Sequence, residues 1–543
     1  MTRGPAGGDL DLAGHLWDVV VIGTGAGGAT AGYALARQGR SVLFLERGKD
    51  LTANADVVRG APWTGRADTA LAHGWWPEPL AGRYRSRGSD EATADTASEE
   101  VFHHPLGCGT GGSTSVFGMV MDRFRPEDFT PRRFCRSASG SSLPDSWPIS
   151  YDELAPFYQQ AEALFRVRGT PDPLTRANGQ LMTPPPAAPK ETALSSALTA
   201  SGLHPYRIHY AQDRVPTCTG CPGMLCPNGC RNDAGRVCLR PAIEQHRARL
   251  LSECRVVGLE EEGRVVRRAI CEHDGRRLAI QARVFVLAAN AFATPALLQR
   301  SSNDRFPGGL GNSSGLVGRN LMLHVTDFLL LRFKRKRDRV AGAMHHGLSL
   351  NDFYVHDGDK LGNVHAHSVA VGPQEITAFL RLHTRWVNRL PSALVSAMAT
   401  LGARVNRAST VFATIVEDLP YVDNRVEATP RTSSGIVYHY RYPEELGARA
   451  RALFQAFQAA VEARFSVSPL RRLGMLNYGH VCGTCRFGTD PATSVLDRDN
   501  RAHDLDNLYI VDGSFLPSSG GINPSLTIVA NSLRVSETIT RRL

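Results

Sequence analysis

The 543-residue chain has no long hydrophobic run. No stretch approaches the roughly 18 uninterrupted apolar residues that a membrane-spanning helix needs, so we do not expect an integral membrane protein. Residues 1–11 lack an apolar core, which argues against a secretory signal peptide at that place. No internal repeat is evident, and the hydrophobic content of 42% is typical of a globular protein. We therefore predict a soluble, cytoplasmic, globular protein.

The chain is also short of acidic residues relative to basic ones. It has 52 Asp and Glu against 62 Lys and Arg, which gives a net charge of +10. A basic chain can bind nucleic acid. Here, however, the arginines are scattered along the whole length, and the one dense basic run is residues 332–339. Scattered charge of this kind is typical of a solvated surface, so we predict no nucleic-acid partner.

The N-terminal region carries a glycine motif in a strand–turn–helix setting. A strand-like apolar run, residues 17–22, precedes Gly23, Gly25 and Gly28, and a second apolar run ends at Glu46. In Gly-x-Gly-x-x-Gly the glycines make a tight turn, let the backbone approach a pyrophosphate and let the helix pack closely on the strand. The helix N-terminus offers free N–H groups to phosphates, and Glu46 can accept hydrogen bonds from a ribose diol. The motif predicts dinucleotide binding but does not choose between NAD and FAD.

Further segments make that choice by their order along the chain. Together with the N-terminal motif, they resemble the glucose–methanol–choline (GMC) oxidoreductase family from about residue 19 to the end. Pro295 also suits the first position of a helix. The segments are the glycine-rich run 106–114 with Gly111, Gly112 and Ser113, the run 147–154, Asn290 with Thr294 and Pro295, the run 417–421, the run that starts at His480, the strand that ends at Asp512, and Asn523 with Pro524.

The resemblance implies an α/β (α+β) fold. A Rossmann-like FAD-binding domain would be interleaved with a substrate domain built on a mainly antiparallel sheet. At about 150 residues per domain the length allows three or four domains, and interleaved enzymes often count as two. The expected FAD-binding domain comprises residues 1–145, 240–325 and 475–543, and the substrate-binding domain comprises residues 146–239 and 326–474, with a cysteine-rich loop at 218–238.

The resemblance also implies FAD as the cofactor. Glu46 would contact the adenosine ribose, the second glycine-rich segment would lie beside the flavin, and Asp512 with Gly513 would lie near the pyrophosphate and ribityl chain. The expected cofactor-binding residues are Gly23, Gly25, Ala26, Gly28, Glu46, Gly109, Gly111, Gly112, Ser113, Asn290, Asp512, Gly513, Asn523 and Pro524.

Oxidation of an alcohol needs a base for the hydroxyl proton and an acceptor for the hydride. FAD would supply the acceptor, and the protein must supply the base. The resemblance puts His480 at the family's catalytic histidine and Asn523 at a second position where relatives carry His or Asn. We predict His480 as the base and Asn523 as a hydrogen-bond donor to the substrate oxygen. The alternative for Asn523, which precedes Pro524, is a cap of the last helix.

Five of the eleven cysteines lie in one short tract. Thiolates at such spacing suit zinc or an iron–sulfur cluster, and some sugar dehydrogenases of the family carry a 3Fe–4S cluster. The spacing departs from the pattern of those enzymes, so we favour a loop with free thiols or local disulfides and predict no metal. The tract comprises Cys218, Cys221, Cys226, Cys230 and Cys238.

A narrower resemblance is carried by residues 106–113, 147–150, 350–354 and 361–363. These runs are similar to bacterial dehydrogenases of aminoglycoside antibiotic pathways, which oxidise a primary alcohol of an aminosugar, and the resemblance implies such a substrate. A polycationic substrate needs carboxylates, for which Asp352, Glu417, Asp418 and Asp423 are candidates. The net charge of +10 would repel such a substrate at long range. Other sugars, sterols or simple alcohols stay open, as does a hydroxynitrile-lyase-like reaction without net redox. The electron acceptor is oxygen or an unidentified group.

Overall fold

The structure is a computed structural model that describes most of the chain. The segment 1–11, in which a signal peptide was not expected, lies outside the described residues. No described helix is long and apolar enough to cross a bilayer. The described residues are 12–61, 67–85, 98–102, 105–135, 139–175, 179–215, 218, 221, 223–366, 372–373, 376–377, 380–381, 385–406 and 408–543.

The first sheet has seven strands and contains the N-terminal motif. Strand β1 lies between β2 and β9 and pairs in parallel with both, whereas β7, β8 and β9 form an antiparallel meander. Residues 19–22 of β1 are all buried, as expected for a central parallel strand covered on both faces. In order across the sheet, the strands are β6 (Arg249–Leu251), β2 (Val42–Leu45), β1 (Leu16–Ile22), β9 (Arg276–Leu287), β8 (Val265–His273) and β7 (Cys254–Glu262), with β21 (Leu508–Ile510) paired to β9.

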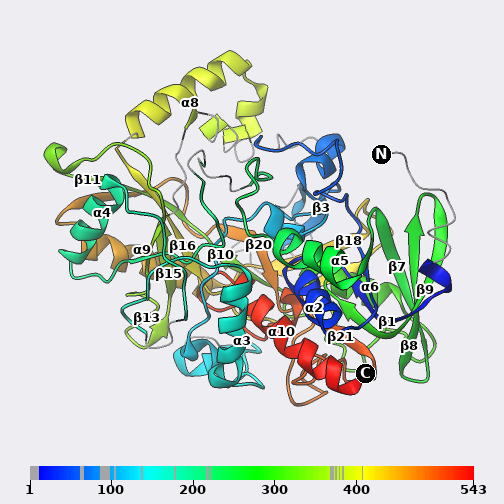
Figure 1. The fold of residues 1–543 in the computed structure, drawn as a ribbon. Coiled ribbons are helices and arrows are strands. Elements are labelled where there is room, and N and C mark those ends of the chain that lie inside the picture. The colour runs from blue at the N-terminus through cyan, green and yellow to red at the C-terminus, as the bar shows by residue number, and fades with distance from the viewer. Residues whose placement is uncertain are drawn as a thin grey trace.

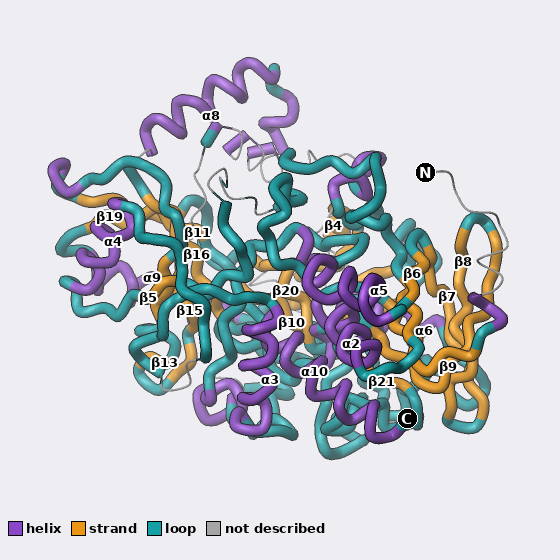
Figure 2. Tube along the Cα trace, in the orientation of Figure 1, coloured by secondary structure: helices purple, strands orange, loops and turns teal. Residues whose placement is uncertain are grey.

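Helices cover this sheet on the side that faces the rest of the molecule. Helix α2 contacts α10 and α5, and in Figure 2 these three helices form a group between the strands of the first sheet and those of the second. The described α-helices are α2 (Ala26–Arg37), α3 (Tyr151–Leu164), α4 (Pro189–Thr199), α5 (Arg240–His246), α6 (Asn290–Arg300), α8 (Ser392–Asn406), α9 (Glu444–Val461) and α10 (Ser525–Arg542).

The second sheet has eight strands, and every pair in it is antiparallel. It occupies the other half of the molecule (Figure 1). Strand β10 joins β20 to the body of the sheet through β16. The strands are β19 (Phe465–Pro469), β11 (Phe328–Phe333), β16 (Thr410–Val416), β15 (Gly362–Ala366), β12 (Leu348–Leu350) and β5 (Tyr206–Arg207), with β10 (Met322–Val325) and β20 (Leu476–Cys482) at one side.

Smaller sheets tie distant parts of the chain together. Strand β18 pairs in parallel with β3, although about 350 residues separate them. The four-stranded sheet comprises β17 (Arg425–Ala428), β18 (Ile436–Arg441), β3 (Leu80–Arg85) and β4 (Ser98–Phe102), and a two-stranded sheet comprises β13 (Val355–His356) and β14 (Asp359–Lys360).

The architecture confirms the predicted α/β class, with a mixed, Rossmann-like sheet whose central strands are parallel and a separate antiparallel sheet. The expected domain limits at residues 325 and 475 fall beside β10 and β20, and both strands pair within the antiparallel sheet. The two expected domains therefore share that sheet, and the limits themselves stay a prediction.

One local expectation was wrong. Pro295 lies inside α6, which begins at Asn290, and not at the first position of the helix. A proline inside a helix leaves the carbonyl four residues earlier without its N–H donor. Here that carbonyl belongs to Ala291, and the hydroxyl of Thr484 donates to it at 2.8 Å. A side chain from another part of the chain thus replaces the missing hydrogen bond.

Candidate active site

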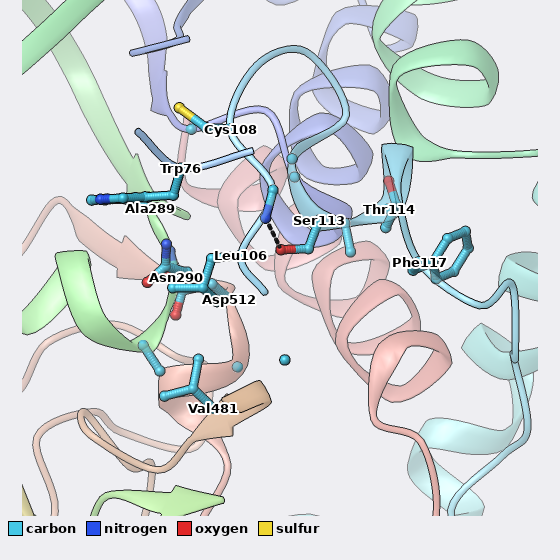
Figure 3. A pocket seen from close by; sticks show the side chains of 18 of the residues that line it. Trp76, Leu106, Cys108, Ser113, Thr114, Phe117, Ala289, Asn290, Val481 and Asp512 are labelled. Carbon is cyan, nitrogen blue, oxygen red and sulfur yellow. Dashed lines mark hydrogen bonds between the residues drawn. The ribbon is translucent and has the colours of Figure 1, made fainter. Parts of the chain in front are cut away.

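A cavity of about 440 Å³ lies where the two sheets meet. One end is lined by the turn between β1 and α2, the end of β2 and the glycine-rich segment. The other end is lined by side chains of β11, β15, β16 and β20, and by the residues that precede α10. Figure 3 shows part of this lining, with Ser113 and Thr114 on one side and Asn290, Val481 and Asp512 on the other.

The glycine turn before α2 leaves open space at the helix N-terminus. Gly23 has a φ of +97°, and a Cβ there would lie 2.4 Å from the carbonyl oxygen of Ala288. A Cβ on Gly28 would lie 2.1 Å from the carbonyl oxygen of Gly23, so this glycine permits the close helix–strand contact. A Cβ on Gly25, in contrast, would have its nearest atom 3.9 Å away. This open space beside free helical N–H groups fits a pyrophosphate.

Glu46 is buried and already has several donors. Its Oε2 accepts hydrogen bonds from the backbone N and the hydroxyl of Thr24, at 3.1 and 2.6 Å. Its Oε1 accepts from the backbone N of Gly48 at 2.8 Å and of Gly109 at 3.3 Å. Glu46 lines the cavity, as a ribose contact requires. It also joins the first glycine turn to the second glycine-rich segment, a role that the motif did not reveal.

The second glycine-rich segment follows a path that only glycine adopts readily. Gly109, Gly111 and Gly112 have φ values of +119°, +91° and +52°. A Cβ on Gly112 would lie 2.8 Å from Cα of Gly25, so the two predicted glycine segments are in direct contact. The hydroxyl of Ser113 accepts from the backbone N of Gly107 at 3.0 Å, the bond drawn in Figure 3. The segment thus forms one wall of the cavity.

Asp512 and Asn290 support the middle of the cavity. A carboxylate oxygen of Asp512 accepts from the backbone N of Asn290 at 3.0 Å and from the hydroxyl of Thr294 at 2.5 Å. Burial raises the pKa of Asp512 above its usual value. The side-chain oxygen of Asn290 accepts from the backbone N of Phe292 at 2.8 Å, at the start of α6. Both predicted residues line the cavity, and each also holds the local backbone.

The reactive end is built from side chains on separate elements. His480 lies on β20, and its Nε2 is 3.3 Å from Nδ2 of Asn523. Its Nδ1 is 3.0 Å from Nδ1 of His324, which lies on the paired strand β10. Burial, and then the neighbouring His324, hold the pKa of His480 well below its usual value. A neutral imidazole in this position is chemically able to accept a proton.

Asn523 does not cap the last helix. The N-cap of α10 is Pro524, and no side chain caps it. The Oδ1 atom of Asn523 is buried, and none of the described residues donates a hydrogen bond to it. An unpartnered polar atom that lines a cavity is costly unless a bound molecule satisfies it. The structure therefore brings Asn523 and His480 together, and Oδ1 of Asn523 is available as an acceptor for a bound molecule.

The candidate substrate carboxylates are elsewhere. Asp352 pairs with Nδ1 of His204 at 2.8 Å. Glu417 and Asp418 are fully buried behind the cavity, and Asp423 is exposed on the surface. None of the four lines the cavity, whose described carboxylates are Glu46 and Asp512.

Tertiary packing keeps Glu417 and Asp418 away from the cavity. Oε2 of Glu417 lies 2.7 Å from Nζ of the buried Lys360, and Oδ2 of Asp418 accepts from Tyr440 at 2.8 Å. Burial raises the pKa of Asp418 to about 8. Neither acid therefore reaches the cavity, and a role of these residues in substrate binding stays a prediction.

Four cysteines of the tract, Cys218, Cys221, Cys226 and Cys230, form a buried cluster beside the cavity, whereas Cys238 packs in the main core. Sγ of Cys230 lies 3.6 Å from that of Cys226 and 3.9 Å from that of Cys218. The guanidinium of the buried Arg231 contacts Sγ of Cys221 at 3.1 Å. Within the described part of the chain, no group of three or more His, Cys, Asp or Glu side chains is placed to hold a metal ion. The metal alternative thus receives no support.

Comparisons with known proteins show which family the chain belongs to. The family of FAD dependent oxidoreductases matches residues 18–310, and the family of GMC oxidoreductases matches residues 414–532. Paromamine 6'-oxidase of Streptomyces fradiae is 30% identical, with 97% of this chain and 91% of the relative covered. The chain belongs to the GMC oxidoreductase family.

Another relative and a solved structure are also similar to this chain over nearly its whole length. The 6'''-hydroxyparomomycin C oxidase of Streptomyces lividus is 29% identical, over 99% of this chain and 95% of the relative. Among solved structures, pyridoxine 4-oxidase from Mesorbium loti has a TM-score of 0.60 at 19% identity, over 97% of this chain and 99% of that one. This structural likeness concerns the fold alone.

As a GMC oxidoreductase, the protein is an FAD-dependent alcohol oxidoreductase, and the predicted cofactor is confirmed. Its cavity fits a dinucleotide, because the turn at Gly25 is open and Gly112 lies against that turn without a side chain. His324 is a neighbour of His480 that was not predicted from the sequence. It stands in no recognised motif, and only its position on β10 opposite β20 brings it to His480.

Proposed function

We propose that the protein oxidises the primary alcohol of an aminosugar, at a stage of aminoglycoside biosynthesis. The support is the pair formed by His480 and Asn523 at the reactive end of the cavity, together with relatives named for paromamine and hydroxyparomomycin that cover nearly the whole chain. We also propose that the reaction takes place in the cytoplasm.

FAD supplies the hydride acceptor when it is bound. In our proposal His480 accepts the hydroxyl proton at Nε2, and Asn523 binds the substrate oxygen as the negative charge develops there. In the structure Nδ2 of Asn523 faces Nε2 of His480 at 3.3 Å. A substrate hydroxyl that lies in the cavity within hydrogen-bond distance of both nitrogens would donate to the imidazole and accept from the amide.

We propose that the cofactor is held mainly by backbone groups and small residues. Glu46 would accept from the ribose while it keeps the surrounding loop in place, and Asp512 would orient the backbone near the centre of the cofactor. The residues assigned to this role are Gly23, Gly25, Ala26, Gly28, Glu46, Gly109, Gly111, Gly112, Ser113, Asn290, Asp512, Gly513, Asn523 and Pro524, which all line the cavity except Gly28, Gly109 and Gly111.

Substrate recognition would depend on neutral groups. Near His480 the cavity is lined by Thr326, Phe328 and Asn477, among others. Hydroxyl and amide groups can bind sugar hydroxyls, and an aromatic ring can pack on the apolar face of a sugar. Because these residues carry no charge, they offer no ion pair to a protonated amine next to the reacting carbon.

Anaerobic flavin reduction tests this function. Purified holoenzyme is mixed with aminoglycosides, other sugars, sterols and simple alcohols, and bleaching of the flavin absorbance is followed. We expect the fastest bleaching with a pseudodisaccharide aminoglycoside that has a free primary hydroxyl. Faster bleaching by a sterol or simple alcohol would refute the aminosugar assignment. Cyanohydrin cleavage without bleaching would indicate a lyase. The same assay in air shows whether oxygen accepts the electrons.

A further inference from the structure

His324 joins the reactive histidine to the backbone of the loop before α10. Its side chain is fully buried. Its Nε2 lies 2.7 Å from the carbonyl oxygen of Gly520 and 3.1 Å from that of Ser519. Its Nδ1 lies 3.0 Å from Nδ1 of His480, and the two rings are perpendicular. Nε2 of His480 faces Nδ2 of Asn523. The four groups form one continuous chain from backbone to cavity.

These contacts determine where the protons lie. A carbonyl oxygen only accepts hydrogen bonds, so Nε2 of His324 must carry a proton. Burial lowers the pKa of His324 to about 4, so the ring is neutral at physiological pH. A neutral imidazole has a single N–H, which leaves Nδ1 of His324 as an acceptor. The proton between the two rings therefore belongs to Nδ1 of His480, and Nε2 of His480 keeps its lone pair.

We propose that His324 is a positioning residue that selects the tautomer of His480 with a free lone pair on Nε2, directed at Asn523 and the substrate cavity. This inference rests on the proposed role of His480 as the base. The opposite tautomer carries its proton on Nε2 and cannot accept one from a substrate hydroxyl. Hydrogen-bond partners fix histidine tautomers in this way at metal and catalytic sites. Here the partner is a second, neutral imidazole.

Asn477 is a second neighbour of Nδ1 of His480, and it competes with His324 for the hydrogen bond to that atom. Its Nδ2 lies 3.4 Å from Nδ1 of His480, and a donor at this place favours the opposite tautomer. The amide is oriented by other contacts, because its Oδ1 accepts from the backbone N of Gly479 at 3.0 Å and its Nδ2 donates to the hydroxyl of Thr326 at 3.0 Å. The amide nitrogen of Asn477 has two protons, one of which donates to Thr326, and its contact to His480 is longer than the contact that His324 makes. The shorter His324 contact therefore favours a proton on Nδ1 of His480, and the amide nitrogen of Asn523, 3.3 Å from Nε2 of His480, favours the same tautomer.

Buried groups hold the carbonyls that orient His324. The backbone N of Gly520 donates to Oε1 of Glu417 at 3.1 Å, and the backbone N of Gly521 donates to the hydroxyl of Tyr354 at 2.9 Å. Glu417 is itself paired with the buried Lys360. Glu417 therefore helps to position His324 by holding the loop backbone, although Glu417 itself does not line the cavity.

The arrangement also suits the proton transfer. When Nε2 of His480 accepts the hydroxyl proton, the ring becomes a cation with an N–H at both nitrogens. Its Nδ1–H continues to donate to Nδ1 of His324, so no proton has to move between the rings. A fixed acceptor lowers the cost of forming a cation in a buried site.

Two variants separate this role from a purely structural one. In His324→Gln the amide nitrogen can take the place of Nε2 and donate to the loop carbonyls, but no acceptor remains at the position of Nδ1. In His324→Asn the amide oxygen can take the place of Nδ1 and accept from His480, but the side chain is too short to donate to the carbonyls. We expect the limiting rate of anaerobic flavin reduction to fall about 10- to 100-fold with Gln and less with Asn, at nearly constant KM. A role limited to anchoring the loop predicts the reverse order, and that order would overturn the proposal.

A double variant tests whether His324 acts through His480. Added to His480→Ala, His324→Gln should cause no further loss of rate, because a tautomer has no effect once the ring is gone. Losses that multiply would mean that His324 acts independently, contrary to the proposal. If His480→Ala alone reduced the flavin at the full rate, the proposed function would fail instead. The two failures are therefore distinguishable.

Nitrogen NMR reads the tautomers without any turnover. The protein is labelled with ¹⁵N-histidine, and the two rings are assigned with His480→Ala and His324→Gln. We expect a protonated Nδ1 on His480 and a protonated Nε2 on His324. A wild-type His480 that carries its proton on Nε2 would refute the inference whatever the kinetics show.

Discussion

The two ends of the cavity are built from different kinds of groups. At the nucleotide end the turn at Gly25 and the segment around Gly112 present backbone, and their contact depends on the absence of side chains. At the reactive end the side chains of His324, His480 and Asn523 meet from three separate parts of the chain. The nucleotide end depends on the space that glycines leave beside the backbone, and the reactive end depends on which side chains the fold brings together.

This difference explains how each end responds to change. A backbone cradle is sensitive to added volume, since a single methyl group meets a carbonyl oxygen at Gly28. A side-chain site is sensitive to lost groups and to protonation, since its function depends on one lone pair. Each end is therefore best probed with the change to which it should respond most.

The largest effect is expected at the reactive end. His480→Ala should keep its flavin and its fold, because the cradle lies at the other end of the cavity. The limiting rate of anaerobic flavin reduction should fall about 10²- to 10⁴-fold, the usual loss for a positioned base. Stopped-flow absorbance measures this rate. An unchanged rate would remove His480 from the chemistry.

A matched pair of alanine variants tests the nucleotide end. At Gly28 a methyl group would overlap the carbonyl oxygen of Gly23, so Gly28→Ala should destabilise the apoprotein by about 1–3 kcal/mol. At Gly25 the φ of −71° suits alanine and the nearest atom is 3.9 Å away. Gly25→Ala should therefore leave the apoprotein stable and weaken FAD binding about tenfold or more, a loss of at least about 1.4 kcal/mol.

Thermal unfolding and flavin titration of the apoproteins distinguish the two variants. Gly25→Ala with wild-type FAD affinity would show that the pyrophosphate does not lie at this turn. An apoprotein destabilised equally by both substitutions would show that the space at Gly25 is needed by the protein itself.

An effect that grows with pH is expected from Asp418, which lies behind the reactive end. Its folded pKa is raised to about 8 by burial, against about 3.9 in an unfolded chain. Between these values the unfolded state releases a proton that the folded state retains, so stability falls as pH rises from about 4 to about 8. Asp418→Asn removes this contribution, worth about 1.4 kcal/mol per pH unit.

Melting temperatures across this pH range measure the contribution. The advantage of Asp418→Asn over wild type should grow from pH 5 to pH 7.5, and Asp423→Asn, at an exposed position, should show no such trend. A pH-independent difference between Asp418→Asn and wild type would mean that the carboxyl titrates normally.

The smallest change is expected in the pH profile of the reductive half-reaction. Burial lowers the pKa of His480 well below its usual value, so the neutral, proton-accepting form persists as pH falls. The limiting rate of flavin reduction should stay nearly constant between about pH 8 and pH 6 and decline only at lower pH. A decline centred near pH 6.5 would show that the imidazole is solvated in the working enzyme.

The sequence predicted the backbone path of the nucleotide end. The strand, turn and helix around Gly23, Gly25 and Gly28 appear in the structure where the spacing placed them. The meeting of His480 and Asn523 was predicted from family motifs. The position of Pro295 was wrong, because the compensating hydroxyl of Thr484 comes from a distant segment. No local pattern contains that information.

By itself, the sequence determined the dinucleotide-binding unit and the family, because glycine spacing and strand–helix alternation are local properties that a short stretch of chain carries. Only the tertiary structure decided the environment of the chemistry. His324 and His480 are 156 positions apart, and the burial of Glu417 and Asp418 results from packing by many segments. Proton positions and pKa values depend on those surroundings, so they exist only in the folded protein.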